Sequence, residues 1–253
     1  MSDILRIESH GRVLRVILNR AEKRNALNAA LCRELVDALE TADRDPGVGA
    51  ILLSANGKSF CAGMDVSEIG PGTSDEIADA NERLFTIGNR LTKPVIAAVD
   101  GSALGGGLGL VANCHIVIAS DHATFGLTEV RLGLWPFLVF RAVEAAVGER
   151  RAMELALTGR TISARAAHDI GLVHEITHDL GEVSFQLAAS VAAFSPTAIR
   201  QGMLFVQQTR GKDWVTAGVI GRRMRNEVFA SPDFQEGIRA FREKRPPHWP
   251  SLG

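Results

Sequence analysis

Four glycines within five residues constrain this chain more than any other feature of its sequence. The run Gly105-Gly106-Gly107-Leu108-Gly109 closely follows the apolar stretch 95–99. Glycine accepts positive φ and allows two backbone segments to approach closely. A glycine-rich turn between a strand and a helix presents unpaired N–H groups at the positive end of the helix dipole. The run therefore predicts an anion site, for either a phosphate or a negative charge that develops in a reaction.

Short apolar segments alternate with segments of helical periodicity through most of the chain. The expected strands are 14–18, 50–53, 95–99, 116–119 and 124–125. The expected helices are 26–42, 74–91, 108–113, 138–147, 150–157 and 164–170. Strands that alternate with helices in this way predict an α/β fold.

The character of the sequence changes at Ser195-Pro196. Strand signals disappear beyond this point, and residues 196–245 show helical periodicity with charged faces before Pro246-Pro247. We therefore expect a catalytic core at 1–195 and a separate helical C-terminal region at 196–253.

Charge and cysteine content exclude several classes of protein. The formal net charge of the 253 residues is -1, so the chain lacks the basic surface typical of proteins that bind nucleic acid. Its three cysteines are odd in number and widely spaced, which argues against a disulfide framework and favours a reducing compartment. They are Cys32, Cys61 and Cys114.

The sequence carries no recognisable targeting or membrane signal. Met1-Ser2-Asp3-Ile4 lacks the basic flank and apolar core of a secretory signal. Asp100 and His115 interrupt the apolar region 95–119, which therefore lacks the roughly 20 apolar residues of a membrane span. We expect a cytoplasmic protein without a membrane partner.

His174-Glu175-Ile176-Thr177-His178 matches the HExxH zinc motif, but its context differs. That motif requires a helix, which places both histidines on one face. Here Gly171-Leu172-Val173 precedes it, and the residues between the histidines favour a strand or turn. On a strand the two histidines would lie about 13 Å apart, too far to share a metal ion. We expect no metal site.

Two phosphate-binding patterns also match in part. Gly57-Lys58-Ser59 resembles the end of a P-loop, but Leu52 stands where that motif needs glycine. The segment 107–112 fits the loose dinucleotide pattern G-x-G-x-x-A, and Glu129 follows about 20 residues later, where a ribose-binding acid is expected. No second nucleotide-binding half is visible in the sequence.

Another loop, earlier in the chain, favours a different use of the glycine run. Residues 59–66 follow the expected strand 50–53, as the glycines follow the strand 95–99. Two such turns could direct their free N–H groups at one oxygen. Paired backbone donors of this kind stabilise an enolate or a tetrahedral oxyanion in acyl chemistry.

These loops and their flanking segments resemble the crotonase (enoyl-CoA hydratase/isomerase) superfamily over nearly the whole chain. The matching segments are 18–28, 60–65, 94–107, 125–133, 157–173 and 236–245. The resemblance implies a spiral of repeated ββα units with a C-terminal helical trimerisation region, assembled as a homotrimer or a hexamer formed from two trimers. It also implies an acyl-CoA substrate and no cofactor other than the coenzyme A of the thioester.

The resemblance also assigns site residues. It implies an oxyanion hole formed by the N–H groups of Met64 and Gly106, with Glu129 as the catalytic acid and base. The apolar stretch 134–140, with Trp135 and Phe137, suits an acyl pocket for a hydrophobic acyl group, or equally the start of a buried core helix. The expected coenzyme A contacts are Arg24, Ala26, Ala62 and Asp65, together with Phe241 and Lys244 from a neighbouring subunit. Arg24 and Lys244 could equally be solvated cations, and the small residues ordinary packing.

One position departs from the pattern of two-glutamate hydratases. Their first glutamate corresponds to Gly109 here, whereas the second corresponds to Glu129. Adding water readily uses two carboxylates, but moving a double bond needs one that removes and returns a proton. We therefore expect an isomerase. The alternatives are a hydratase that uses Glu129 alone or with Asp65 or Glu68, and a non-catalytic acyl-CoA-binding scaffold.

Overall fold

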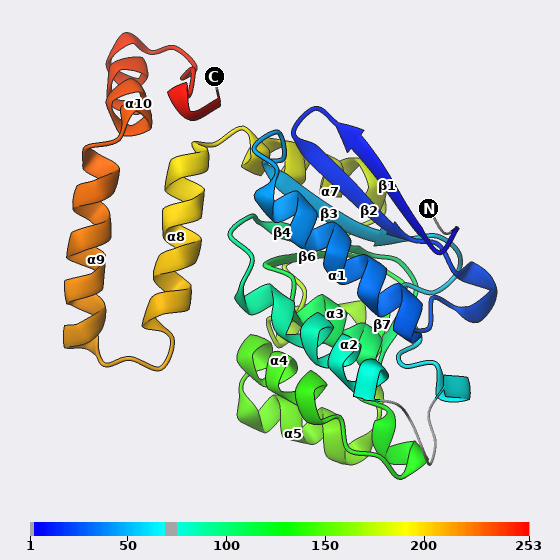
Figure 1. Cartoon of the computed structure of the whole chain (residues 1–253). Coiled ribbons are helices and arrows are strands. Elements are labelled where there is room, and N and C mark those ends of the chain that lie inside the picture. Colours follow the sequence, from blue (N-terminus) through cyan, green and yellow to red (C-terminus); the bar gives the residue numbers. More distant parts are fainter. Residues whose placement is uncertain (1–2, 69–74, 253) are drawn as a thin grey trace.

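The computed structural model describes residues 3–68 and 75–252. Its larger sheet has six strands in the order β1-β2-β3-β4-β6-β9 (Figure 1). Strands β1 and β2 are antiparallel, and every later neighbouring pair is parallel. The strands are β1 Leu5–His10, β2 Val13–Leu18, β3 Ala50–Ala55, β4 Val95–Val99, β6 Ile116–Ser120 and β9 Glu175–Thr177.

A second, smaller sheet is formed by short strands that follow strands of the large sheet along the chain. It contains β5 Ser102–Leu104, β7 Thr124–Gly126 and β8 Thr161–Ser163. Strand β5 follows β4 and β7 follows β6, so successive strands of the large sheet each lead into a short strand of the small one. Strands β5 and β7 are parallel, as this repetition requires, and β8 runs antiparallel to β7.

Helices cover both faces of the large sheet. The core helices are α1 Ala29–Arg44, α2 Asp75–Thr86, α3 Gly106–Ala112, α4 Phe137–Val147, α5 Glu149–Thr158, α6 Ala164–Asp169 and α7 Leu180–Ala192. Helix α7 packs on one face, where Leu52, Ile96 and Ile118 are buried. The opposite face contributes to the larger hydrophobic core with α1, α2 and α3. Burial on both faces explains why these strands are continuously apolar rather than alternating.

The starts of α1 and α3 differ from the prediction for local reasons. Helix α1 begins at Ala29 because the Asn28 side chain accepts the Leu31 N–H at 2.9 Å, whereas Leu27 pairs with Met64 in a β-bridge. Helix α3 begins at Gly106, inside the glycine run. Strands β1, β5 and β8 were not predicted. Of the expected helix 74–91, Ser74 lies outside the described residues, and α2 is followed by a 3-10 turn at Ile87–Asn89.

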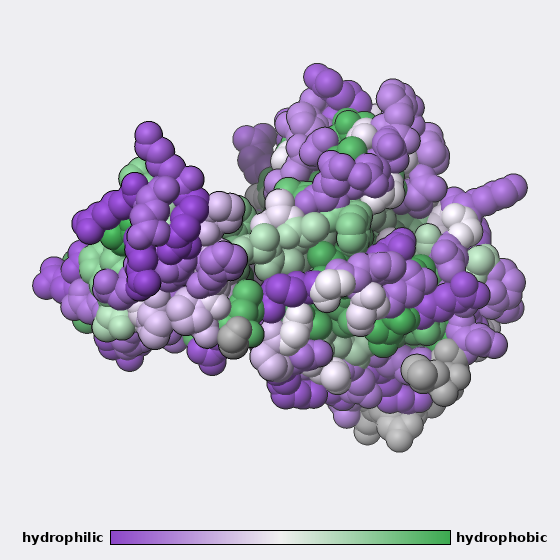
Figure 2. Space-filling model, turned by 90° about the horizontal axis from the view of Figure 1, so that it is seen from above, coloured by the Kyte–Doolittle hydropathy of each residue, from purple (hydrophilic) through white to green (hydrophobic). Residues whose placement is uncertain are grey.

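The C-terminal part of the chain is helical and stands apart from the core (Figures 1 and 2). It comprises α8 Pro196–Thr209, α9 Trp214–Phe229 and α10 Pro232–Glu243. Side-chain caps at Ser195, Asp213 and Ser231 begin these three helices. Within residues 3–68 and 75–252, no helix is long and apolar enough to cross a membrane. That the C-terminal helical region mediates trimerisation stays a prediction.

Candidate active site

Two loops are expected to hold an oxyanion, the first at residues 59–66 and the second at the glycine run 105–109, and they lie against each other. The Cys61 N–H donates to the Ser102 carbonyl at 3.0 Å, and the Leu104 N–H donates to the Cys61 carbonyl at 2.9 Å. A Cβ atom at Gly107 would lie 2.2 Å from the Cys61 carbonyl oxygen, closer than atoms can approach. Glycine at position 107 therefore permits the close contact between the loops.

Each loop contributes an N–H group that backbone pairing within the described residues leaves without an acceptor. The Leu27 N–H binds the Gly63 carbonyl at 2.8 Å, and the Asp65 N–H binds the Leu27 carbonyl at 2.9 Å. In such a parallel bridge the intervening Met64 directs its own N–H to the opposite side. A Cβ atom at Gly106 would lie 3.6 Å from Met64 N, so both nitrogens border one small space. Among the described residues, neither the Met64 nor the Gly106 N–H has a hydrogen-bond acceptor.

Glu129 lies beside this pair of donors. It begins the 3-10 turn Glu129–Leu132 after β7, and β7 is joined to the second loop by the Gly105 N–H, which donates to the Gly126 carbonyl at 2.8 Å. A Cβ atom at Gly105 would lie 3.0 Å from Glu129 Oε1, and the φ of Gly105 is +53°. The carboxyl group therefore packs directly against the backbone of the second loop.

The Glu129 carboxyl group is poorly solvated. Its Oε2 is buried and has no hydrogen-bond partner within the described part of the chain. Burial disfavours the charged form and raises the pKa of Glu129 above its ordinary value. A carboxylate with a raised pKa accepts a proton more readily than an ordinary carboxylate does, as a proton shuttle requires.

We expect Glu129→Gln to stabilise the fold at neutral pH. Because the folded pKa of Glu129 exceeds its unfolded value, its ionised form costs stability above the folded pKa, and this cost disappears below the ordinary value of about 4.5. The variant should melt about 2 °C higher than the wild type at pH 7.5, but not at pH 4. Calorimetry at both pH values measures this difference, and a lower melting temperature for the variant at pH 7.5 would contradict it.

A pocket of about 380 Å³ surrounds the donors and the carboxyl group. It brings together seven residues predicted from the sequence, namely Met64, Gly106, Glu129, Arg24, Ala26, Ala62 and Asp65. The lining also includes Gly63, Val66 and Gly105 from the two predicted loops and Leu134 from the apolar stretch 134–140. The lining residues that the sequence did not reveal are Glu22, Lys23, Thr128 and Leu132. Leu132 follows Glu129 so closely that its position could have indicated it.

A buried asparagine holds the Arg24 segment at the pocket. Asn25 is fully buried, and its side-chain amide donates to the carbonyls of Asn56 at 2.9 Å and Ser59 at 2.8 Å. Arg24 and Asn25 both adopt positive φ, and the Arg24 carbonyl accepts the Ala62 N–H at 3.0 Å. This turn fixes Arg24 and Ala26 beside the first oxyanion loop.

Asp65 lines the pocket, but its carboxylate is already bound. Arg20 Nη1 lies 2.6 Å from Asp65 Oδ2 and also donates to the Ala26 carbonyl at 3.0 Å. The Ser67 hydroxyl donates to Asp65 Oδ1 at 2.6 Å. Hydrogen bonds from Ser67 and Arg20 lower the pKa of Asp65 to about 2. The geometry supports a structural role for Asp65 more directly than the predicted contact with coenzyme A.

Removing one partner of this ion pair should destabilise the protein. The Arg20 and Asp65 side chains are only 14% and 11% exposed, so Arg20→Met would leave a poorly solvated carboxylate without its cation. We expect a loss of about 3 kcal/mol in the free energy of unfolding, measured with urea. Arg83→Met removes two surface ion pairs, to Asp37 and Glu40, and should cost less than about 1 kcal/mol. Equal losses in the two variants would contradict this role.

The other predicted contacts do not line the pocket. Trp135 packs against Phe140, with 5.7 Å between the ring centroids, and Phe137 is 71% exposed. Leu132 and Leu134 occupy the expected place of these aromatic residues at the pocket wall. Phe241 is 83% exposed on α10, and Lys244 ends that helix with a φ of 53°; neither lines the pocket of its own chain.

The position of the missing hydratase carboxylate is filled by apolar side chains. A Cβ atom at Gly109 would lie 3.0 Å from both Phe85 Cε1 and Val139 Cγ1. Asp65 and Glu68, the two acids considered as replacements for that carboxylate, both bind other groups. Asp65 binds Arg20, and Glu68 Oε2 accepts the Ala29 N–H at 2.9 Å at the start of α1.

The HExxH segment, predicted to form a strand or a turn, forms the strand β9, and its two histidines flank that strand. His174 Nδ1 accepts the Val117 N–H at 3.1 Å, and His178 lies 3.2 Å from Asp121. In the described ranges, no group of three or more histidine, cysteine or acidic side chains could hold a metal ion.

Comparison with known proteins identifies the class to which this fold and site belong. A family model described as enoyl-CoA hydratase/isomerase matches residues 8–251. The "Probable enoyl-CoA hydratase" of Mycobacterium leprae is 35% identical over 253 residues, covering 98% of each chain. The 2,3-dehydroadipyl-CoA hydratase of Escherichia coli is 34% identical over 251 residues, again covering 98% of each.

The solved structures agree. The crystal structure of enoyl-CoA hydratase from Bacillus anthracis matches with a TM-score of 0.93 at 30% identity, covering 98% of this chain and 99% of that one. The chain therefore belongs to the enoyl-CoA hydratase/isomerase family and has the crotonase fold. These findings confirm the resemblance and the fold class predicted from the sequence.

Proposed function

We propose that this protein moves a double bond in an enoyl-CoA thioester, with Glu129 as the proton shuttle and the Met64 and Gly106 N–H groups as the oxyanion hole. The observation that carries the proposal is one poorly solvated carboxyl group beside two unpaired backbone donors. Arg24, Ala26 and Ala62 border the same pocket and would contact the coenzyme A portion.

The proposed reaction begins with a 3-enoyl thioester. The Glu129 carboxylate removes a proton from C2, and the electron pair moves into the thioester carbonyl to form a dienolate. The two N–H groups stabilise the oxygen as it gains negative charge. The protonated Glu129 then donates its proton to C4, so that the carbonyl re-forms and the double bond lies between C2 and C3. No water or redox partner is consumed.

Packing around Gly109 favours this reaction over hydration. Water addition needs a group that positions and deprotonates water, and Phe85 and Val139 fill the space where two-glutamate hydratases carry that group. Hydration by Glu129 alone is the second candidate, and the hydratase names of the relatives favour it. In that case, Glu129 would both deprotonate water and protonate the α-carbon.

Product identification separates these possibilities. The purified protein is incubated with 3-enoyl-CoA and, separately, with 2-enoyl-CoA, and the products are separated by liquid chromatography against standards of both isomers and weighed by mass spectrometry. An isomerase converts the first substrate without gaining 18 mass units, whereas a hydratase converts the second to a 3-hydroxyacyl thioester. Binding of coenzyme A thioesters without conversion of any substrate would indicate the non-catalytic scaffold.

A further inference from the structure

One aromatic side chain separates the reaction centre from a second cavity. Phe85 lies near the end of α2 and is only 4% exposed. Its Cζ would lie 3.1 Å from a Cβ atom at Gly106, and its Cε1 would lie 3.0 Å from one at Gly109. The Phe85 ring therefore packs along α3 from Gly106, the proposed oxyanion donor, to Gly109.

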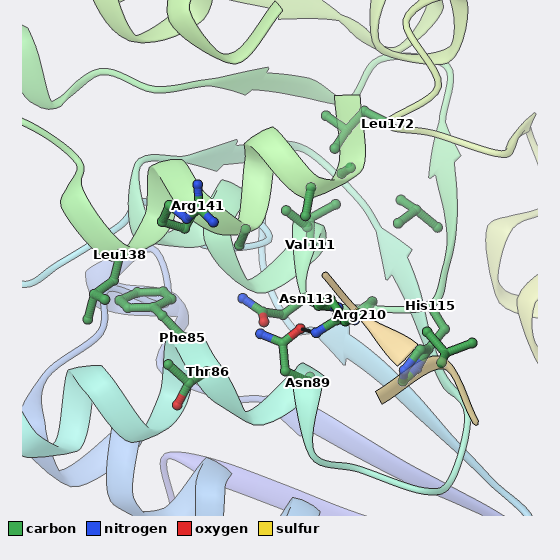
Figure 3. A pocket seen from close by; sticks show the side chains of 18 of the residues that line it. Phe85, Thr86, Asn89, Val111, Asn113, His115, Leu138, Arg141, Leu172 and Arg210 are labelled. Atoms are coloured by element: carbon green, nitrogen blue, oxygen red, sulfur yellow. Dashed lines mark hydrogen bonds between the residues drawn. The ribbon is translucent and has the colours of Figure 1, made fainter. Parts of the chain in front are cut away.

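The far side of Phe85 faces a cavity of about 480 Å³, larger than the catalytic pocket. Phe85 lines this cavity and not the catalytic pocket, whereas Gly106 lines the catalytic pocket and not the cavity. The cavity therefore lies on the Phe85 side of this contact, and the catalytic pocket lies on the Gly106 side. Figure 3 shows the Phe85 ring at the Leu138 end of the cavity, with Asn113 and Arg210 further away.

Part of the cavity wall beyond Phe85 suits a hydrocarbon chain, whereas Asn113, His115, Arg141 and Arg210 give the rest a polar lining. Val111 from α3 and Leu138 and Ala142 from α4 line it on one side. Helix α3 has seven residues and spans about 10 Å, so an acyl chain could lie along it for several methylene groups. Each methylene buried there would tighten binding about fourfold.

We propose that Phe85 is the residue that limits acyl length, and that the wild-type protein acts on short-chain acyl-CoA thioesters. This inference rests on the proposed function, because it places the thioester carbonyl at Met64 and Gly106. A point beside Gly106 lies within 3.6 Å of both Met64 N and Phe85 Cζ. An acyl chain extending inward from the carbonyl therefore meets the Phe85 ring, which closes the way to the cavity.

Phe85→Ala tests the proposal by joining the two spaces. Affinities for butyryl-CoA and decanoyl-CoA, measured by calorimetry, report acyl fit without any chemical step. We expect the wild type to favour butyryl-CoA, and Phe85→Ala to raise the decanoyl-to-butyryl affinity ratio at least about tenfold. Because loss of a buried aromatic ring can unfold a protein, Phe85→Leu provides a milder variant with a smaller rise in the same direction.

Two further variants make the test specific. Met203→Ala enlarges the same cavity from α8 without opening the wall at Gly106, and should leave the ratio unchanged. Adding Ala142→Phe to Phe85→Ala refills the cavity and should cancel the rise. An unchanged ratio in folded Phe85→Ala and Phe85→Leu, or an equal rise in Met203→Ala, would overturn the proposal.

The assay also separates this inference from the proposed function. Wild-type protein that binds short saturated thioesters but converts no enoyl-CoA would overturn the proposed reaction and leave the length limit standing. Wild-type protein that isomerises 3-enoyl-CoA but binds both thioesters equally would overturn the length limit alone. Failure to bind any thioester would overturn both.

Discussion

Replacing Glu129 with glutamine should lower kcat for isomerisation of 3-enoyl-CoA by about 10²–10⁴-fold, the range typical of a lost general acid–base group. The amide cannot accept the C2 proton, but it preserves the size of the side chain against Gly105. KM should change by less than about threefold, because the lost interaction acts mainly in the transition state. Steady-state kinetics with purified protein measure both constants.

Glu175→Gln is a matched control for this variant. Glu175 is an exposed glutamate on β9 and does not line the pocket, so the substitution should leave kcat unchanged. Turnover by Glu129→Gln within about threefold of the wild type would show that another group moves the proton.

Adding a methyl group to the oxyanion loop at Gly107 should be nearly as damaging. A Cβ atom there would lie 2.2 Å from the Cys61 carbonyl oxygen, so Gly107→Ala must push the two loops apart. Because Met64 and Gly106 lie on opposite loops, their N–H groups could no longer converge on one oxygen. We expect kcat to fall about 10²–10³-fold, the cost of losing one oxyanion donor, with about 1–3 kcal/mol of destabilisation.

Gly202→Ala separates this geometric effect from the general effect of changing a glycine. Gly202 lies within α8, and a Cβ atom there would meet no atom within 4 Å. The control should therefore gain up to about 1 kcal/mol in helix stability, with unchanged kcat. Urea unfolding and steady-state kinetics are measured for both variants. Full activity in folded Gly107→Ala would show that loop contact is not needed for catalysis.

The glycine run and the continuous apolar strands were the parts of the sequence most informative about the fold. The strand predicted at 95–99 is observed as β4, because a strand buried on both faces is apolar throughout. The predicted start of α1 at residue 26 was wrong. Leu27 fits the helical spacing of apolar residues, but its backbone pairs with Met64 in a β-bridge. Such long-range pairing leaves no periodic signal in the local sequence.

The sequence indicated the reactive groups of the site more clearly than the residues that line its walls. Glu129 and the two loops occur in recognisable segments, and the structure brings them into one pocket. No sequence pattern indicated that Phe85 lies beside the site. Its contacts with Gly106 and Gly109 join α2 to α3 across more than twenty residues of sequence. The pocket-lining function predicted for Trp135 and Phe137 assumed that aromatic residues near Glu129 face the substrate, whereas Leu132 and Leu134 line the pocket.

Glu129 is proposed to carry a proton between carbon atoms of a bound enoyl thioester. This transfer is measured by converting 3-enoyl-CoA, deuterated at C2, in ordinary water, and determining the position of the label in the product by NMR and mass spectrometry. We expect 2-enoyl-CoA with some of the deuterium moved to C4, and loss of this transfer in Glu129→Gln. Formation of a 3-hydroxyacyl thioester instead, or equal transfer by Glu129→Gln, would contradict this proposal.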